Sequence, residues 1–294
     1  MKRVKLSYMA KLASFATIVA GTALAAGPAV ASPITISGIT FGQGSSFKST
    51  QIFENIVTAP GSTLTGIGKV LEIDSLSGDC AGTGGTCWNT GDNGRELTFS
   101  FSYFVQKISI ISTGVGQAWF SGGAVNFYSD ASTVGGSATS DPFTSISGTQ
   151  ATDFARATDG TPWLNTLGAW TGTTCAIADG CFSGAGTQIT LESTFSVGSG
   201  GLSAVLAGSG HGFLNINMAG SGLANYNFNT NTFFNGSDID LGSSFHKCVG
   251  TRCDFPLAGT AELNSYTVPE PGSLLLLGSG LLGLASFRRK RARA

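Results

Sequence analysis

The chain has 294 residues and a formal net charge of −1; 41% of its residues are hydrophobic and 11% are charged. This composition excludes an intrinsically disordered protein, which would combine few hydrophobic residues with dense charge. Glycine occurs 43 times, about twice its usual frequency, so we expect a folded protein with many turns.

The first 31 residues have the three parts of a secretory signal peptide. A basic start leads into an apolar stretch at residues 12–26, and Ala29 and Ala31 supply the small residues of a cleavage site. We expect cleavage between Ala31 and Ser32 and export of the rest of the chain. An uncleaved anchor is the alternative, but a Gly-Pro dipeptide ends the apolar stretch just before the site.

Residues 32–267 form a body that we predict to be one domain. It has 7 basic and 16 acidic residues, which gives a net charge of −9. Nucleic acid and anionic lipid would be repelled by this charge, so neither is expected as a partner. Neutral polysaccharide, or carboxylates bridged by calcium, is compatible with it. No cofactor is expected.

Apolar and polar residues alternate along many short stretches of the body. In the clearest one, residues 96–105, apolar residues occupy every second position from Leu97 to Val105, so one face of this strand must be buried. Residues 187–197 repeat the pattern with a Thr/Ser-rich polar side, which is either solvated or ligand-binding. Further strands are expected at residues 63–73, 108–112, 117–120, 124–129, 202–206, 213–218, 238–245 and 260–268.

The predicted fold class is all-β. Short strands separated by Gly, Asn and Ser favour an antiparallel β-sandwich, jelly-roll-like in arrangement. A β-barrel closed from the same strands is the alternative. Residues 129–148 and 149–181 have the weakest strand signals and are expected to form a long insertion or loops. We recognise no amphipathic helical pattern of ten or more residues.

All six cysteines fall in the body as three close pairs. An even number of cysteines in an exported, loop-rich chain indicates disulfides. Local pairing is favoured because a small loop closes at the least entropic cost. A zinc site is disfavoured because the spacings lack the C-x2-4-C and histidine pattern. The predicted pairs are Cys80 with Cys87, Cys175 with Cys181, and Cys248 with Cys253.

No catalytic motif stands out, and we expect that the protein is not an enzyme. The body has two histidines, His211 and His246, without a nucleophile elbow or a His-Glu-x-x-His motif. His211 lies among glycines and is expected in a turn. Asp238 and Asp240 lie two residues apart, which favours a solvated strand face over a catalytic pair; a glycosidase needs two carboxylates facing each other across a cleft.

The segment at residues 87–99 is the densest polar and aromatic cluster. Its acidic pair, Asp92 and Glu96, could offer oxygen ligands to calcium, but the spacing of a calcium loop is absent. A loop that leads into the strand expected at residues 96–105 is the preferred interpretation. No metal site is therefore predicted.

The last 27 residues, 268–294, consist of three parts: a short turn motif, an apolar run at residues 274–287 and a basic block. As a helix the run would be roughly 21 Å long, short of the ~30 Å hydrocarbon core, so we expect a short transmembrane helix that inserts transiently. The basic block should stay cytoplasmic, which leaves the body outside. An ordinary membrane anchor is the alternative.

In the order of these parts the tail resembles the PEP-CTERM sorting signal of Gram-negative bacteria that make exopolysaccharide. The resemblance implies recognition by an exosortase, a transpeptidase-like membrane protease. Cleavage near the motif would then release the body to the cell surface or extracellular matrix. The motif residues are Pro269, Glu270 and Pro271.

Three body segments, residues 57–71, 87–99 and 120–130, resemble PEP-CTERM proteins linked to flocculation. The resemblance implies that the protein holds cells to extracellular polymer. We therefore predict a non-enzymatic surface or matrix protein in exopolysaccharide-associated aggregation, biofilm or floc formation. The alternatives are a carbohydrate-binding module and a polysaccharide hydrolase. The tryptophans that would stack on sugars in such a module are Trp88, Trp119, Trp163 and Trp170.

Overall fold

The computed structural model describes residues 32–80, 82, 85–131, 149–183, 186–249 and 253–268. The predicted signal peptide with Ala31, the motif at residues 269–271 and the predicted membrane helix lie outside them. Among the described residues, no helix is long and apolar enough to cross a membrane.

The described body is all-β apart from a few short helices. Its strands are β1 (Ile34–Ile36), β2 (Ile39–Phe41), β3 (Gly44–Glu54), β4 (Thr63–Val70), β5 (Glu72–Ser75), β6 (Thr86–Asn89), β7 (Arg95–Ser112), β8 (Val115–Ala131), β9 (Thr161–Ala169), β10 (Thr174–Cys175), β11 (Thr187–Val197), β12 (Val205–Ile216), β13 (Ile239–Lys247) and β14 (Leu257–Tyr266). Its helices are α2 (Gln150–Thr158), α3 (Asn225–Phe228) and the 3-10 turns η2 (Asp92–Gly94), η3 (Ile177–Asp179), η4 (Gly201–Ser203) and η5 (Phe234–Gly236).

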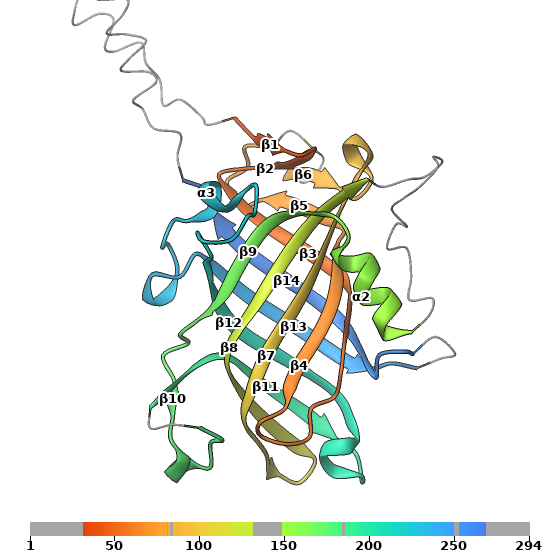
Figure 1. Cartoon of the computed structure of the whole chain (residues 1–294), viewed down its shortest axis with the longest axis vertical. Helices are drawn as coiled ribbons and strands as arrows, with labels where there is room; N and C mark the ends of the chain where they lie inside the picture. The colour runs from red at the N-terminus through yellow and green to blue at the C-terminus, as the bar shows by residue number, and fades with distance from the viewer. Residues whose placement is uncertain are drawn as a thin grey trace, which may run out of the picture. The chain divides into compact units, whose positions relative to one another are not determined.

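Eight strands close into one antiparallel barrel in the order β11-β12-β13-β14-β3-β4-β7-β8 (Figure 1). The ring closes because β8 pairs with β11, with Trp119 opposite Glu192 and Gly116 opposite Phe195. The predicted jelly-roll-like β-sandwich is therefore wrong, and the barrel that we gave as the alternative fits. Strand periodicity shows which face is buried, but a sandwich and a barrel bury one face alike.

Strand β9 completes the wall beside β11. One end of β8 pairs with β11, and the other end, residues 126–129, pairs with β9. Strand β12 divides its length in the same way, with Gly212 opposite Leu191 of β11 and Phe213 opposite Ala169 of β9. β9 and β11 thus fill the space between β8 and β12 from opposite ends.

Three strands are longer than the sequence pattern indicated. β8 is one strand of 17 residues and contains both strands expected at residues 117–120 and 124–129. β7 is one strand of 18 residues, where we expected two, because its pairing with β8 continues past several register shifts. β12 is continuous through a Gly-rich segment where we expected a turn, so His211 lies in a strand. Its glycines allow close approach of bulky neighbours, since a Cβ on Gly208 would lie 2.7 Å from the Cβ of Phe195.

Helix α2 packs on the outside of the barrel, where its Phe154 and Ala157 contact a cluster that includes Ile67 and Phe255. Thr149 caps the helix because its Oγ1 accepts a hydrogen bond from the N–H of Thr152 at 3.4 Å. The prediction that residues 149–181 form loops is wrong, since they contain α2, β9 and β10. A helix of nine residues is too short for the pattern that we required.

Aromatic side chains from β2, β3, β8, β9 and α3 fill one end of the barrel. The ring centroids of Phe41 and Phe228 lie 4.8 Å apart, and those of Phe47 and Phe228 lie 5.6 Å apart. The Nε1–H of buried Trp163 donates to the carbonyl of Ile36 at 3.1 Å. We call Phe41, Phe47, Phe127, Trp163 and Phe228 the aromatic plug. Two of these rings come from β2 and α3, and both elements lie at the end of the barrel that also carries β1 (Figure 1).

The three disulfides are all local. Their Cα atoms lie 5.0, 6.0 and 5.7 Å apart in chain order. The first joins the loop after β5 to β6, the second spans η3, and the third spans the loop between β13 and β14. Each therefore pins a connection rather than the barrel wall. The bonded pairs are Cys80–Cys87, Cys175–Cys181 and Cys248–Cys253.

Candidate functional site

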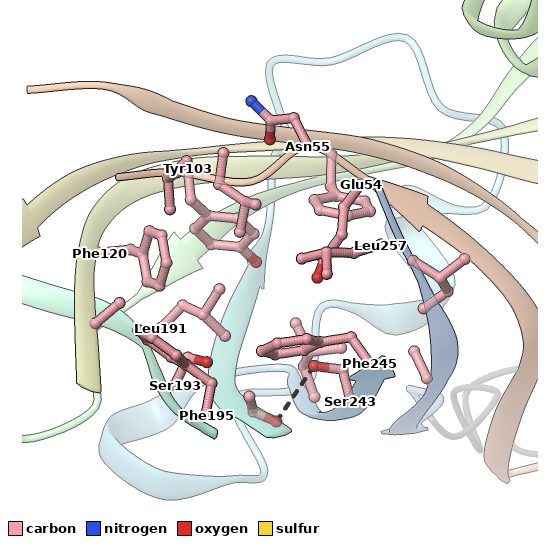
Figure 2. Close-up of a pocket in the computed structure, with 18 of the residues that line it drawn as sticks. Glu54, Asn55, Tyr103, Phe120, Leu191, Ser193, Phe195, Ser243, Phe245 and Leu257 are labelled. Carbon is pink, nitrogen blue, oxygen red and sulfur yellow. Dashed lines mark hydrogen bonds between the residues drawn. The ribbon is translucent and has the colours of Figure 1, made fainter. Parts of the chain in front are cut away.

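The barrel interior beyond the aromatic plug contains a cavity lined from all eight barrel strands. Its volume is about 80 Å³, measured as the space open to the centre of a water-sized sphere. On the same measure one water molecule needs about 10–15 Å³. Aromatic and aliphatic side chains make up most of the lining; Figure 2 shows Phe120, Leu191, Phe195, Phe245 and Leu257 around the space. An eight-stranded barrel has room for one small ligand, and this interior fits that description.

A few polar side chains interrupt this apolar lining. Glu54 and Tyr103 are its titratable residues, and Ser193 and Ser243 add hydroxyl groups. Ser243 has a partner in the wall, because its Oγ donates to the carbonyl of Gly210 at 3.4 Å (Figure 2). Such a lining, mostly apolar with a few placed polar groups, is typical of small-molecule sites.

Glu54 is the last residue of β3 and points inward because the strand alternates. Ile52 lies on the same inner side, whereas Phe53 turns outward and its ring lies 6.2 Å from that of Phe255. The next residue, Asn55, fixes the end of the strand: its Nδ2–H donates to the carbonyl of Thr63 at 3.0 Å, and its Oδ1 accepts from the N–H of Thr65 at 2.8 Å. These bonds hold the backbone that aims Glu54 into the cavity.

Burial raises the pKa of Glu54 to about 8 from an ordinary value of 4.5. The charged form is disfavoured because the apolar surroundings do not solvate it. At neutral pH the side chain is therefore mostly a neutral carboxylic acid, which can donate a hydrogen bond as well as accept one. Among the described residues, no hydrogen bond or ion pair reaches this carboxyl group.

Tyr103 lies on the inner face of β7, opposite Leu64 of β4. The predicted inner face of β7 is Leu97, Phe99, Phe101, Tyr103 and Val105; all are at most 2% exposed except Phe101, which is half-buried. On the opposite face Glu96 and Thr98 are buried as well. The hydroxyl of Tyr103 is buried and has no hydrogen-bond partner among the described residues. Burial also raises the pKa of this phenol above its usual range, so the group stays protonated.

The acidic pair at the start of β13 has structural contacts. Asp238 is 1% exposed, so the predicted solvated face is wrong for it. Its carboxylate accepts backbone N–H groups of Ile216, Thr230 and Asn231 at 2.8, 2.6 and 2.7 Å. Asp240 lies 2.9 Å from Nε2 of His211 on the outside of the barrel. The two carboxylates therefore do not face each other across a cleft.

The other acidic pair is also separated. Glu96 is fully buried and its Oε2 lies 2.8 Å from Nζ of Lys69. Asp92 lies in η2, where its Oδ2 accepts from the N–H of Asn89 at 2.8 Å. The two side chains thus serve different contacts and do not form the cluster that calcium would need. Within the described part of the chain, no three acidic, histidine or cysteine side chains are grouped as metal ligands.

The four tryptophans do not line an exposed face. Trp88 and Trp163 are 1% and 0% exposed. Trp119 is half-buried with Nζ of Lys107 4.8 Å from its ring centroid, and Trp170 is half-buried with its Nε1–H donating to Thr173. Stacking of sugar on these four side chains therefore has no exposed platform.

Sequence reasoning missed the two polar groups of the cavity for different reasons. Tyr103 was on the predicted buried face, but nothing in the alternation indicated an unpaired hydroxyl. Glu54 follows Ile52 at the spacing of a strand, and an acid on that apolar side was the available signal. The preceding residues, 44–50, are mostly polar and concealed the strand.

The sorting segment begins where the barrel ends. Backbone N–H groups of the two residues after β14 still bond to the body: Thr267 donates to the carbonyl of Gln43, just before β3, at 2.6 Å, and Val268 to that of Asn227 in α3 at 2.8 Å. The next residue, Pro269, lies outside the described residues. The sorting motif therefore follows the last strand of the barrel directly in the sequence.

Comparison with known families identifies this C-terminal segment. Residues 267–290 match the family model described as the PEP-CTERM protein-sorting motif, which confirms the predicted sorting signal. No curated protein matches the chain. The match begins after the last strand of the barrel and covers none of the strands, so the resemblance to flocculation-associated proteins remains a prediction. The chain thus carries a PEP-CTERM sorting motif, which indicates sorting by an exosortase, export across the inner membrane and location at the cell surface or in the extracellular space after processing.

Proposed function

We propose that the exported barrel is a non-enzymatic binding module that holds a small apolar molecule in its interior at the cell surface. The cavity carries this proposal. Its volume of about 80 Å³ exceeds what several waters need, and its apolar lining offers few partners to water. A molecule with an apolar body would fill this space and contact the rings and aliphatic side chains of the wall.

Binding of the neutral dye N-phenyl-1-naphthylamine to the exported protein tests this function. The dye should brighten and shift to the blue in proportion to the protein. Ala118 faces the cavity and is 2% exposed, so Ala118→Phe should fill the space and weaken dye binding about tenfold or more. Ala207→Phe, at an exposed position of β12, is the matched control. Equal dye affinity in both variants would place the dye outside the barrel and contradict the proposal.

The predicted role in exopolysaccharide-associated aggregation is a second proposal, and the outer surface favours it. On β11 the outward Thr194 and Ser196 are exposed, whereas Phe195 faces inward. Across β13 and β14 the hydroxyls of Ser244 and Thr260 lie 2.8 Å apart. These uncharged hydrogen-bonding groups suit neutral sugar, which an acidic body does not repel.

Sedimentation of the protein with exopolysaccharide from the bacterium that produces it tests the second proposal. The double variant Thr194→Glu and Ser196→Glu should lower the bound fraction, whereas Gln188→Glu, at an exposed position near the start of the same strand, should not. Binding should survive EDTA because we expect a contact without calcium. Loss of binding on chelation, with recovery in calcium, would contradict the cation-independent mode.

A further inference from the structure

Two polar side chains of the cavity have no hydrogen-bond partner among the described residues: Glu54, which is 8% exposed, and Tyr103, whose hydroxyl is fully buried. They come from β3 and β7, which lie on either side of β4 in the barrel. Figure 2 shows both groups pointing into the same space. Buried polar groups normally find a hydrogen-bond partner, so two unpartnered groups aimed into one cavity indicate that a ligand supplies it.

The rest of the wall limits the chemistry of that ligand. Among the described residues, no basic side chain lines the cavity, so a carboxylate head would meet no cation there. From β13 the uncharged Ser243 faces the cavity, whereas Ser244 points outward to Thr260. The Asn55 amide is bonded to the backbone of β4, and β14 contributes apolar side chains. Burial favours the neutral forms of both Glu54 and Tyr103, and in those forms each offers an O–H donor.

We propose that the cavity binds a neutral molecule with an apolar body and one acceptor oxygen, held by the O–H groups of Glu54 and Tyr103. This inference rests on the proposed binding function and adds the chemical class of the ligand. Long-chain ketones, esters and alcohols belong to this class. An ammonium head does not, because it brings donors to a site that already has two and requires Glu54 to lose its proton.

Matched probes with a nine-carbon chain separate these possibilities. Nonane, 2-nonanone and nonylamine would be titrated against the full exported protein by displacement of the dye. At pH 6.5 we expect 2-nonanone to bind about five- to tenfold more tightly than nonane, which corresponds to one or two net hydrogen bonds. At pH 9.5 this preference should shrink, because Glu54 has lost the proton that it donates.

Nonylamine tests the alternative that an ionised Glu54 recognises a cationic ligand. If an ionised Glu54 were the recognition group, the amine would bind more tightly than the ketone. Its affinity would also rise between pH 6.5 and pH 9.5, since an alkyl ammonium stays largely protonated below a pKa of about 10.4. That result would overturn the proposal, as would equal affinity of nonane and 2-nonanone at pH 6.5. If neither nonane nor the ketone displaced the dye, the binding function itself would fail.

Variants assign the effect to the two side chains. Tyr103→Phe should reduce the preference for ketone over nonane about threefold or more by removing one donor. Glu54→Gln keeps an N–H donor of similar shape but cannot titrate, so it should flatten the pH profile of ketone binding. A profile that stays as steep in Glu54→Gln would exclude Glu54. The wild-type pH profile tests the proposal even where a variant fails to fold.

Discussion

Glu54 should make the barrel less stable as the pH rises, and the substitution Glu54→Gln should remove this effect. The pKa is 4.5 in the unfolded chain and about 8 in the folded barrel. Between these values the folded state holds a proton that the unfolded state has released, so the free energy of unfolding falls by about 1.4 kcal/mol per pH unit. Over the whole interval the loss is about 5 kcal/mol, and above pH 8 it is complete.

The assay is denaturant unfolding of wild type and Glu54→Gln with disulfides intact, at several pH values from 4.5 to 8.5. Other titrating groups contribute equally to both proteins, so the difference in free energy isolates Glu54. Glu54→Gln should match wild type near pH 4.5 and exceed it by about 5 kcal/mol at pH 8.5. A difference that stays constant over this range would show that water solvates Glu54 and would refute the dry cavity.

Three further predictions concern the plug, the disulfides and the tail. Phe228→Ala should lower the free energy of unfolding by about 3–5 kcal/mol because the ring is fully buried, whereas Tyr226→Ala, 78% exposed on the same helix, should have little effect; similar losses would contradict the plug. Thiol titration of the exported protein should find no free thiol, and a peptide linking Cys80 to Cys175 would rule out local pairing. Alanine at residues 269–271 should leave uncleaved precursor in the membrane fraction with a folded barrel, and normal processing would argue against recognition of this motif.

Periodicity in the sequence predicted the buried face of single strands. Residues 97–105 of β7 and the inner side of β11, with Leu191 and Phe195, follow the expected alternation. Closure could not be predicted, because it depends on β8 being long enough to pair with β7, β9 and β11 at once. That pairing is a long-range property, whereas alternation is local. The sandwich was wrong for this reason.

The sorting tail can be read from the sequence, whereas the cavity cannot. The sorting tail is a linear signal that was predicted at residues 268–294 without a structure, and the family match covers residues 267–290. The cavity exists because the barrel closes around side chains from distant strands, so Glu54 and Tyr103 meet only in three dimensions. Glu54 also ends a strand whose first half is polar, which hid β3 and the inward direction of the acid.

Xenon binding to crystals of the exported protein would test the apolar cavity most directly. Xenon occupies dry apolar cavities and needs no knowledge of the natural ligand. A peak among Phe120, Leu191 and Phe245 is the predicted result, and Ala118→Phe should remove it. A cavity without xenon that contains ordered waters bonded to Glu54 would contradict binding of an apolar molecule inside the barrel.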